Sequence, residues 1–197
     1  MLDTHGRNTV QPLISMTASF FLKIGLKANH VTFIAFIVGI LASVVVYLGE
    51  PIIGVVILWL SGFLDAVDGS MARYSKSSSA WGTVIDVTFD RIVEAGILVA
   101  LALRHQDPKI LLLFLFLAIA IIFTMTIFLT VGALSEKESY KSFYYQPGLA
   151  ERTEGFILFS LMVLFQTHLS FWTIVFLIVE ILTGLQRLIE AYRILRN

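Results

Sequence analysis

Long uncharged stretches separated by short polar segments dominate the chain. Residues 31–49 and 110–134 contain no charged side chain, and a helix needs about 20 apolar residues to cross a bilayer. Four further mainly apolar segments lie at residues 52–73, 82–103, 155–168 and from 170 to beyond 187. Prolines and glycines mark several of the turns between them. The pattern predicts an all-α, polytopic membrane protein with six transmembrane helices.

The segment from residue 7 to about 26 has a different pattern, in which apolar and polar side chains alternate along one predicted helix. Its apolar members are Pro12, Leu13, Met16, Phe20, Phe21, Ile24 and Leu26, and its polar members are Gln11, Ser15, Thr17 and Lys23. This pattern predicts an amphipathic helix lying in the membrane interface, although a helix packed on the bundle explains it equally well. We expect one domain over residues 1–197, with a juxtamembrane segment at 1–30 and the bundle at 31–195.

Composition and charge place this bundle in a membrane. The chain is 57% hydrophobic and 14% charged, whereas soluble domains are about 25% charged. It has no cysteine, which excludes disulfides and thiolate metal sites. Six spans put both termini on one side, with 11 of the 14 lysines and arginines; two lie opposite and Arg91 lies within a span. The positive-inside rule therefore predicts that both termini and the polar turn at 74–80 face the cytoplasm.

Four aspartates interrupt the second and third apolar segments. Asp65 and Asp68 are three residues apart, and Asp86 and Asp90 are four apart, so each pair lies on one face of its helix. Carboxylates at membrane depth are costly, and two facing pairs would repel each other strongly. Divalent cations relieve that repulsion, and carboxylate oxygens suit Mg²⁺ or Mn²⁺. The spacing predicts a site for two divalent cations.

Small residues and one arginine surround the acidic pairs. Gly69, Ala72 and Gly82 remove side-chain bulk, which allows a helix or a ligand to approach the backbone closely. Arg73 offers a planar fork of donors that suits a phosphate. Two metals would bridge the oxygens of a diphosphate and stabilise its leaving group. A carboxylate could then act as the base for an attacking hydroxyl.

These residues carry a family resemblance. All eight fixed positions of the signature of the CDP-alcohol phosphotransferase family are matched, at the family's spacing: Asp65, Asp68, Gly69, Ala72, Arg73, Gly82, Asp86 and Asp90. The resemblance implies a six-helix, metal-dependent homodimer. It also implies an enzyme that displaces CMP from a CDP-linked alcohol, usually CDP-diacylglycerol, with a second alcohol.

The resemblance also assigns roles to individual residues. Asp65 and Asp86 are similar to ligands shared by both metals, Asp68 to a ligand of the first metal, and Asp90 to a ligand of the second metal and the general base. The residues that resemble those around the CDP group are Gly69, Ala72, Arg73, Ser79, Gly82, Asn29 and Thr32. Asn29 and Thr32 match a Pro-Asn-x-x-Thr element in which Ala28 replaces the proline.

The acceptor alcohol is less well defined by the sequence. Family members that use inositol phosphate carry a basic Arg-Ala-Lys-Ala-Glu cluster, whereas residues 132–136 here read Gly-Ala-Leu-Ser-Glu, which argues against inositol phosphate. Lys141, Arg152 and Arg187 could still line a pocket for an anionic acceptor. Residues 141–145 and 148–154 resemble a bacterial inner-membrane branch of the family. Glycerol phosphate, serine, inositol phosphate, another polyol and a second lipid all remain open as acceptors.

The sequence thus predicts an inner-membrane phosphatidyltransferase of phospholipid synthesis, whose partners are CDP-diacylglycerol, a small alcohol and membrane lipids. No nucleic-acid partner is expected. Two other functions remain open: an intramembrane prenyltransferase, which also binds a diphosphate through aspartates and magnesium, and a divalent-cation transporter. A purely structural alternative is an ion-pair network of the aspartates with Arg73 and Arg91. Arg91 and Glu94 are three residues apart, and we expect them to pair with each other.

Overall fold

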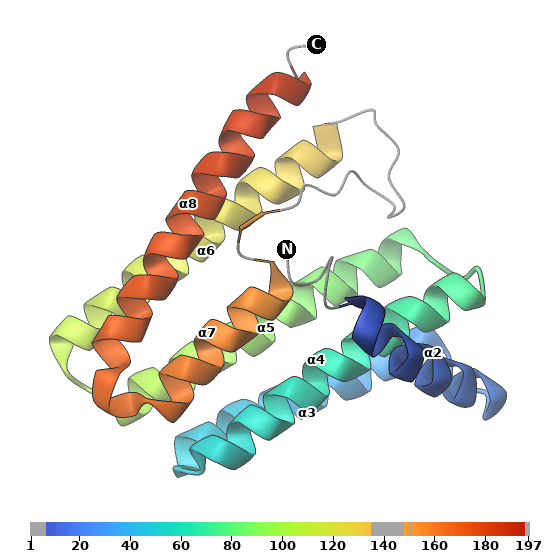
Figure 1. Cartoon of the computed structure of the whole chain (residues 1–197), viewed down its shortest axis with the longest axis horizontal. Coiled ribbons are helices and arrows are strands. Elements are labelled where there is room, and N and C mark those ends of the chain that lie inside the picture. The colour runs from blue at the N-terminus through green and yellow to red at the C-terminus, as the bar shows by residue number, and fades with distance from the viewer. Residues whose placement is uncertain (1–6, 135–147, 150, 196–197) are drawn as a thin grey trace. The chain divides into compact units, whose positions relative to one another are not determined.

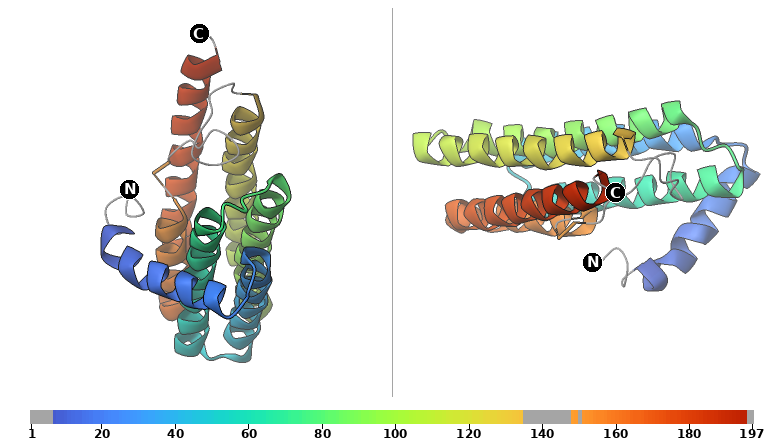
Figure 2. Two further views of the ribbon diagram at one scale, coloured as in Figure 1. Left: turned by 90° about the vertical axis from the view of Figure 1, so that its right-hand side faces the viewer. Right: turned by 90° about the horizontal axis from the view of Figure 1, so that it is seen from above.

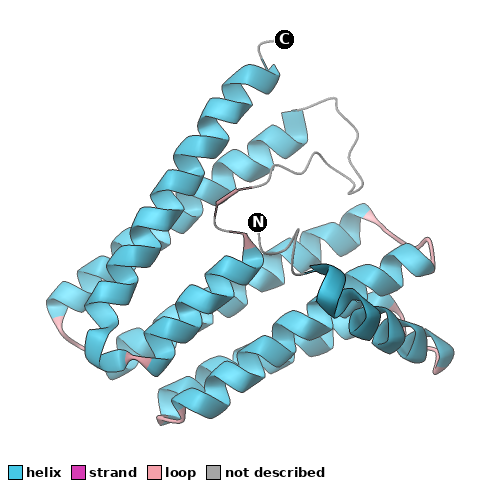
Figure 3. Cartoon of the chain, in the orientation of Figure 1, coloured by secondary structure: helices cyan, strands magenta, loops and turns pink. Residues whose placement is uncertain are grey.

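The computed structural model describes residues 7–134, 148–149 and 151–195, and nearly all of them are helical (Figure 3). No strand occurs among these described residues, which confirms the all-α prediction. In chain order the elements are α2 (Arg7–Lys23), α3 (Ala28–Leu48), α4 (Pro51–Tyr74), α5 (Ala80–Arg104), α6 (Pro108–Leu134), α7 (Arg152–Leu164), the 3₁₀ turn η1 (Gln166–His168) and α8 (Leu169–Leu195).

Prolines and a glycine explain several of these helix boundaries. Pro51 and Pro108 are the first residues of α4 and α6, a position where the missing N–H costs nothing and the fixed φ suits the helix. Gly49 ends α3 with a φ of 98°, and its N–H bonds back to the last turn. Because this left-handed conformation favours glycine, the chain can turn directly from α3 into α4.

The described chain forms two compact units. We call residues 7–104, from α2 to α5, the N-terminal unit, and residues 105–195, from α6 to α8, the C-terminal unit. Figure 1 shows the helices of each unit in the colours of their sequence positions. That the whole chain is a single domain stays a prediction.

In the N-terminal unit, α3 packs along both α4 and α5, and α2 packs against α4. One buried cluster joins α2, α3 and α4 through Ile14, Ala18, Val31, Val67 and Met71. Between α3 and α5, the rings of Phe36 and Phe89 stack with their centroids 4.2 Å apart. The helices that carry the aspartates are therefore both held by α3.

Residues 7–23 form helix α2, and Figure 2 shows it lying at an angle to α3 and α4. It buries Ile14 and Ala18 against the unit. Its exposed apolar side chains are Val10, Leu13, Met16 and Phe20, followed by Ile24 just after the helix. Packing on the bundle thus accounts for one face of α2, and a position of the other face in the membrane interface stays a prediction.

The C-terminal unit is built on the packing of α6 against α8, with α7 also packed on α8. The hydroxyl of Thr124 on α6 donates a 3.0 Å hydrogen bond to the carbonyl oxygen of Glu180 on α8. Phe159 and Phe176 meet edge to face at 4.9 Å between α7 and α8. Buried polar contacts and aromatic rings therefore fix these helices relative to one another.

Among the described residues, four helical segments are long and apolar enough to cross a membrane: residues 28–48, 51–74, 108–134 and 166–195. Helix α5 has 25 residues, but Asp86, Asp90, Arg91 and Glu94 make it too polar to qualify by composition. Helix α7 has only 13 residues, fewer than the roughly 20 that a span requires. The prediction of six spans therefore stays a prediction.

Candidate active site

Three of the four predicted aspartates come together between α4 and α5. Asp65, Asp68 and Asp86 each offer one carboxylate oxygen, and these three oxygens lie within 4.8 Å of one another. Asp90 is not part of this group among the described residues, although it lies one turn after Asp86 on α5. We call Asp65, Asp68 and Asp86 the aspartate cluster.

The surroundings of the cluster explain why a cation fits it. Asp68 is only 5% exposed, and Asp65 and Asp86 are half-buried. Three carboxylates this close repel one another, and partial burial reduces the screening by water. Oxygen donors on two different helices are a ligand set that suits a hard divalent cation such as Mg²⁺ or Mn²⁺. The donor set therefore fits the predicted cation.

Arg73 lies beside the glycine that the sequence placed next to the acids. Its Nη1 is 3.5 Å from the position that a Cβ of Gly69 would occupy, and its Nη2 donates a 2.8 Å hydrogen bond to the hydroxyl of Ser70. The guanidinium of Arg73 therefore folds back along α4, where a Cβ at Gly69 would meet it in ordinary van der Waals contact. Ala72 is half-buried on the same last turn.

The first turns of α3 and α5 bring three other predicted residues together. The N–H of Gly82 donates a 3.0 Å hydrogen bond to the hydroxyl of Ser79, so Ser79 caps the N-terminus of α5. A Cβ on Gly82 would lie 3.2 Å from this hydroxyl and 3.5 Å from Oδ1 of Asn29. Thr32 lies on the first turn of α3, where its hydroxyl donates to the carbonyl oxygen of Ala28 at 3.2 Å.

The predicted acceptor residues belong to the C-terminal unit. Lys141 lies outside the described residues. The guanidinium of Arg152 lies 5.5 Å from the ring centroid of Phe156. Arg187 is 6% exposed, and its guanidinium lies 4.8 Å from the ring centroid of Phe128. Both arginines are therefore placed against aromatic faces, where a cation is attracted to the ring electrons.

Sequence reasoning missed two of these contacts. Ser70 holds Arg73, and the sequence signal was their spacing of three residues on one helix. Gly148 lies against Arg187 and Thr183: a Cβ on Gly148 would lie 3.1 Å from Nε of Arg187 and 2.6 Å from Cγ2 of Thr183. No local sequence signal pointed to this long-range contact.

One pairing that the sequence did indicate is confirmed. Nη1 of Arg91 lies 2.6 Å from Oε2 of Glu94 within α5. Because Arg91 pairs with its neighbour on the same helix, this contact does not support a structural ion-pair network in which Arg91 neutralises the aspartates.

Comparison with known proteins adds independent evidence. The sequence model for CDP-alcohol phosphatidyltransferase matches residues 26–186. The chain is 29% identical over 207 residues to Inner membrane protein YnjF of Escherichia coli (strain K12). The aligned region covers 100% of this chain and 98% of that protein.

Two synthases match over shorter lengths. Archaetidylinositol phosphate synthase of Pyrococcus horikoshii is 40% identical over 80 residues, 41% of this chain and 43% of that enzyme. Phosphatidylinositol phosphate synthase of Streptomyces avermitilis is 31% identical over 107 residues, 53% of this chain and 43% of that enzyme. The chain thus spans less than half of the length of either synthase.

Solved structures share the fold. Phosphatidylinositol phosphate synthase of Mycobacterium tuberculosis with CDP-DAG bound superposes with a TM-score of 0.75 at 20% identity, covering 92% of this chain and 94% of that one. The same enzyme in complex with manganese and citrate gives a TM-score of 0.74 at 20% identity, with 91% and 88% covered. The family match over residues 26–186, which include the whole aspartate cluster, leads to one conclusion: the chain belongs to the CDP-alcohol phosphatidyltransferase family.

Proposed function

We propose that the chain transfers a phosphatidyl group from CDP-diacylglycerol to an acceptor alcohol and releases CMP, as a step of phospholipid synthesis. The observation that carries this proposal is the aspartate cluster, since three carboxylates from two helices converge within 4.8 Å inside a chain of this family. The CDP-DAG bound by a structure of the same fold supports the choice of donor.

In this proposal, Asp65, Asp68 and Asp86 hold divalent cations, and Asp90 completes the ligands of a second one. The manganese in a structure of the same fold supports the kind of ion. When bound, the cations neutralise the diphosphate and stabilise the departing CMP. Arg73 orients a phosphate through its planar fork of donors. Three small residues let the donor approach the helix backbone closely: Gly69, Ala72 and Gly82. The nucleotide is surrounded by Asn29, Thr32 and Ser79.

Asp90 acts as the general base of the proposed reaction. Its carboxylate accepts the proton of the acceptor hydroxyl, whose oxygen then attacks the phosphorus of the phosphatidyl group. The bond from this phosphorus to the oxygen of CMP breaks, and CMP leaves with the electron pair. Arg152 and Arg187, together with Lys141, are proposed to bind an acceptor that carries negative charge.

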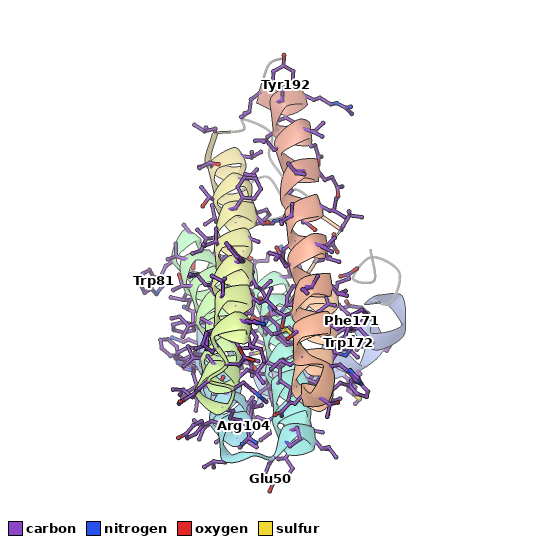
Figure 4. The ribbon with its side chains drawn as sticks, turned by 90° about the vertical axis from the view of Figure 1, so that its left-hand side faces the viewer. Glu50, Trp81, Arg104, Phe171, Trp172 and Tyr192 are labelled. Atoms are coloured by element: carbon purple, nitrogen blue, oxygen red, sulfur yellow. The ribbon has the colours of Figure 1, made fainter. Side chains whose placement is uncertain are left out.

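The direct test measures CMP release by purified protein supplied with CDP-diacylglycerol, Mg²⁺ or Mn²⁺ and a panel of acceptor alcohols. Asp90→Asn should lower turnover by roughly 100-fold to 10,000-fold, the usual contribution of a general base, and retain much of the affinity for CDP. Glu50→Gln is the matched control, because it neutralises an exposed carboxylate that directly precedes the first residue of α4 (Figure 4), at the end of this helix away from Asp65 and Asp68. Normal turnover by Asp90→Asn would exclude the assigned base.

The products separate this proposal from its alternatives. Pyrophosphate release from a prenyl diphosphate, with no release of CMP, would favour the prenyltransferase. Cation movement into liposomes without any CDP-lipid would favour the transporter.

We further propose a homodimer in the inner membrane with six spans, cytoplasmic termini and a cytoplasmic active site. The name of the Escherichia coli relative supports the membrane, and the distribution of lysine and arginine supports the orientation. Helix α2 then lies in the interface with its exposed apolar face toward lipid.

Because the chain has no cysteine, single-cysteine variants can test this topology without background labelling. Ser78→Cys and Gln106→Cys both replace exposed residues, in the turns before and after α5. In intact cells, a membrane-impermeant maleimide should label Gln106→Cys and should label Ser78→Cys only after lysis. The reverse result would invert the orientation. The mass of the purified protein in lipid nanodiscs tests the dimer.

A further inference from the structure

The two helices that carry the aspartate cluster both pack on a third helix, which sets the distance between them. Helix α3 packs along both α4 and α5, whereas α4 and α5 make few direct contacts with each other. Asp65 and Asp68 lie on α4, and Asp86 lies on α5. The distance between the carboxylates of the two helices therefore depends on how closely each one approaches α3.

Both α4 and α5 come close to the backbone of α3 at Gly39, a buried residue of this helix. A Cβ at this position would lie 2.8 Å from Cγ1 of Val93 on α5 and 2.9 Å from Oγ of Ser61 on α4, and nearer still to Cγ2 of Val93. Carbon atoms in ordinary contact are about 3.5–4.0 Å apart. The missing side chain thus lets α4 and α5 both approach the backbone of α3 at one level.

This level lies close to the cluster along both helices. Ser61 precedes Asp65 by one helical turn, and Val93 follows Asp86 by two turns on the same face. At 1.5 Å per residue, these separations are about 6 Å and about 10 Å along the helix axes. A displacement of either helix at Gly39 would therefore reach the carboxylates.

Neither neighbour can easily turn away from an added methyl group. The hydroxyl of Ser61 donates a buried 2.7 Å hydrogen bond to the carbonyl oxygen of Ala35 on α3, and leaving that bond unmade is costly. Val93 is buried and β-branched, so one χ1 rotamer dominates in a helix. A side chain at position 39 would therefore move the helices rather than the side chains.

We propose that Gly39 is a positioning residue that sets the spacing of the carboxylates, and with it the affinity and size preference for the divalent cation. This inference rests on the proposed metal site. Mg²⁺ requires nearly octahedral ligands at about 2.0–2.1 Å, whereas Ca²⁺ accepts irregular ligands at about 2.3–2.6 Å. Because Gly39→Ala pushes α5 away from α3, the cluster loses affinity for small ions more than for large ones.

The test uses the purified full-length protein in nanodiscs and the metal alone as the probe. The signal of free Mn²⁺ in electron paramagnetic resonance reports binding, and Mg²⁺ and Ca²⁺ then compete for the site. Gly39→Ala should weaken Mn²⁺ binding by roughly 10-fold to 100-fold, the range found when groups that support metal ligands are changed. Ca²⁺ should also compete better relative to Mg²⁺ than it does in the unaltered protein.

Two further variants keep the test decisive. Gly39→Ala combined with Val93→Ala removes the Val93 methyl groups that face the new side chain and leaves the contact with Ser61, so it should restore part of the Mn²⁺ affinity. Val93→Ile adds one methylene at the same contact, and should change ion preference in the same direction if Gly39→Ala does not fold. Unchanged affinity and ion preference in the folded variant, or no recovery in the double variant, would overturn the proposal.

Gly54→Ala is the matched control for packing alone. A Cβ there would lie 2.5 Å from Cγ2 of Val46, so it strains the same α3–α4 contact, but 11 residues before Asp65. Gly54→Ala should lower thermal stability and leave Mn²⁺ affinity and ion preference unchanged. An equal loss of Mn²⁺ affinity in Gly54→Ala and Gly39→Ala would show that Gly39 has only a structural role.

The outcome for the unaltered protein separates this inference from the proposed function. Binding of Mn²⁺ without CMP release would reject the reaction and leave the positioning role standing. No binding of Mn²⁺ would overturn the metal site and the positioning role together.

Discussion

Buried charge is organised differently in the two units. In the N-terminal unit, Asp65, Asp68 and Asp86 converge within 4.8 Å, so charges of like sign share one location. In the C-terminal unit, the buried Arg187 lies against the ring of Phe128 and beside Gly148. Clustered acids call for a cation from outside the chain, whereas the face of an aromatic ring attracts an arginine within the fold. The proposed metal chemistry therefore belongs to the aspartate cluster of the N-terminal unit.

The strongest test of this difference between the units is to neutralise the most buried acid of the cluster. Asp68→Asn keeps the shape of the side chain and removes one anionic ligand at a residue that is 5% exposed. We expect Mn²⁺ binding and CMP release to fall by more than the roughly 10-fold to 100-fold that outer-shell changes cost. Titration with Mn²⁺ and the CMP assay measure both effects. If Glu50→Gln, which neutralises an exposed acid, lost as much Mn²⁺ binding and CMP release as Asp68→Asn, the cluster would have no special role.

A smaller effect is expected from the buried arginine. Arg187→Met keeps an unbranched, flexible side chain and removes the guanidinium with its charge. Hydrogen bonds to charged groups contribute about 1.5–3 kcal/mol, and 1.4 kcal/mol is a factor of ten. The KM for an anionic acceptor should therefore rise roughly 10-fold to 100-fold, while the KM for CDP-diacylglycerol stays unchanged. Steady-state kinetics with both substrates measures this.

The control for this prediction is Arg193→Met, an exposed arginine of the same helix. It should leave both KM values unchanged. An unaltered KM for the acceptor in Arg187→Met, together with reduced stability, would instead make Arg187 a structural residue of the C-terminal unit.

The features predicted from sequence are those with local signals. Apolar length predicted the long helices, prolines and glycines marked several of the turns, and the spacing of the aspartates predicted that they share helix faces. Long-range packing had no such signal: nothing local indicated that Gly39 would lie against Ser61 and Val93. The sequence also could not predict that Asp90 lies outside the cluster. Helix periodicity determines the face on which a residue lies but not how far its side chain extends.

A close helix contact in the C-terminal unit offers a milder test of how the units differ. A Cβ on Gly184 of α8 would lie 2.5 Å from Cε1 of Phe123 and 3.0 Å from Oγ1 of Thr124 on α6. Gly184→Ala should therefore destabilise the protein by about 1–3 kcal/mol, the usual cost of overpacking, without changing Mn²⁺ affinity. Unfolding in denaturant and Mn²⁺ titration measure the two quantities.

Gly155→Ala is the control in the same unit, because a Cβ there meets only Cζ of Phe176, at 3.9 Å. It should leave stability nearly unchanged. A loss of Mn²⁺ affinity in Gly184→Ala would show that the metal site depends on the C-terminal unit as well, and the contrast between the units would not hold.

The smallest expected effect separates a structural role from a binding role at Ser79. Its hydroxyl accepts the N–H of Gly82 at 3.0 Å and caps α5, the helix that carries Asp86. Ser79→Ala should cost about 0.5–2 kcal/mol of stability, and Ser79→Asn, which caps as well as serine, should restore it. If capping is the whole role, both variants keep the KM for CDP-diacylglycerol of the unaltered protein. A KM that rises in both, while only Ser79→Ala loses stability, would show that the hydroxyl also contacts the donor, because asparagine can replace the cap but not that contact.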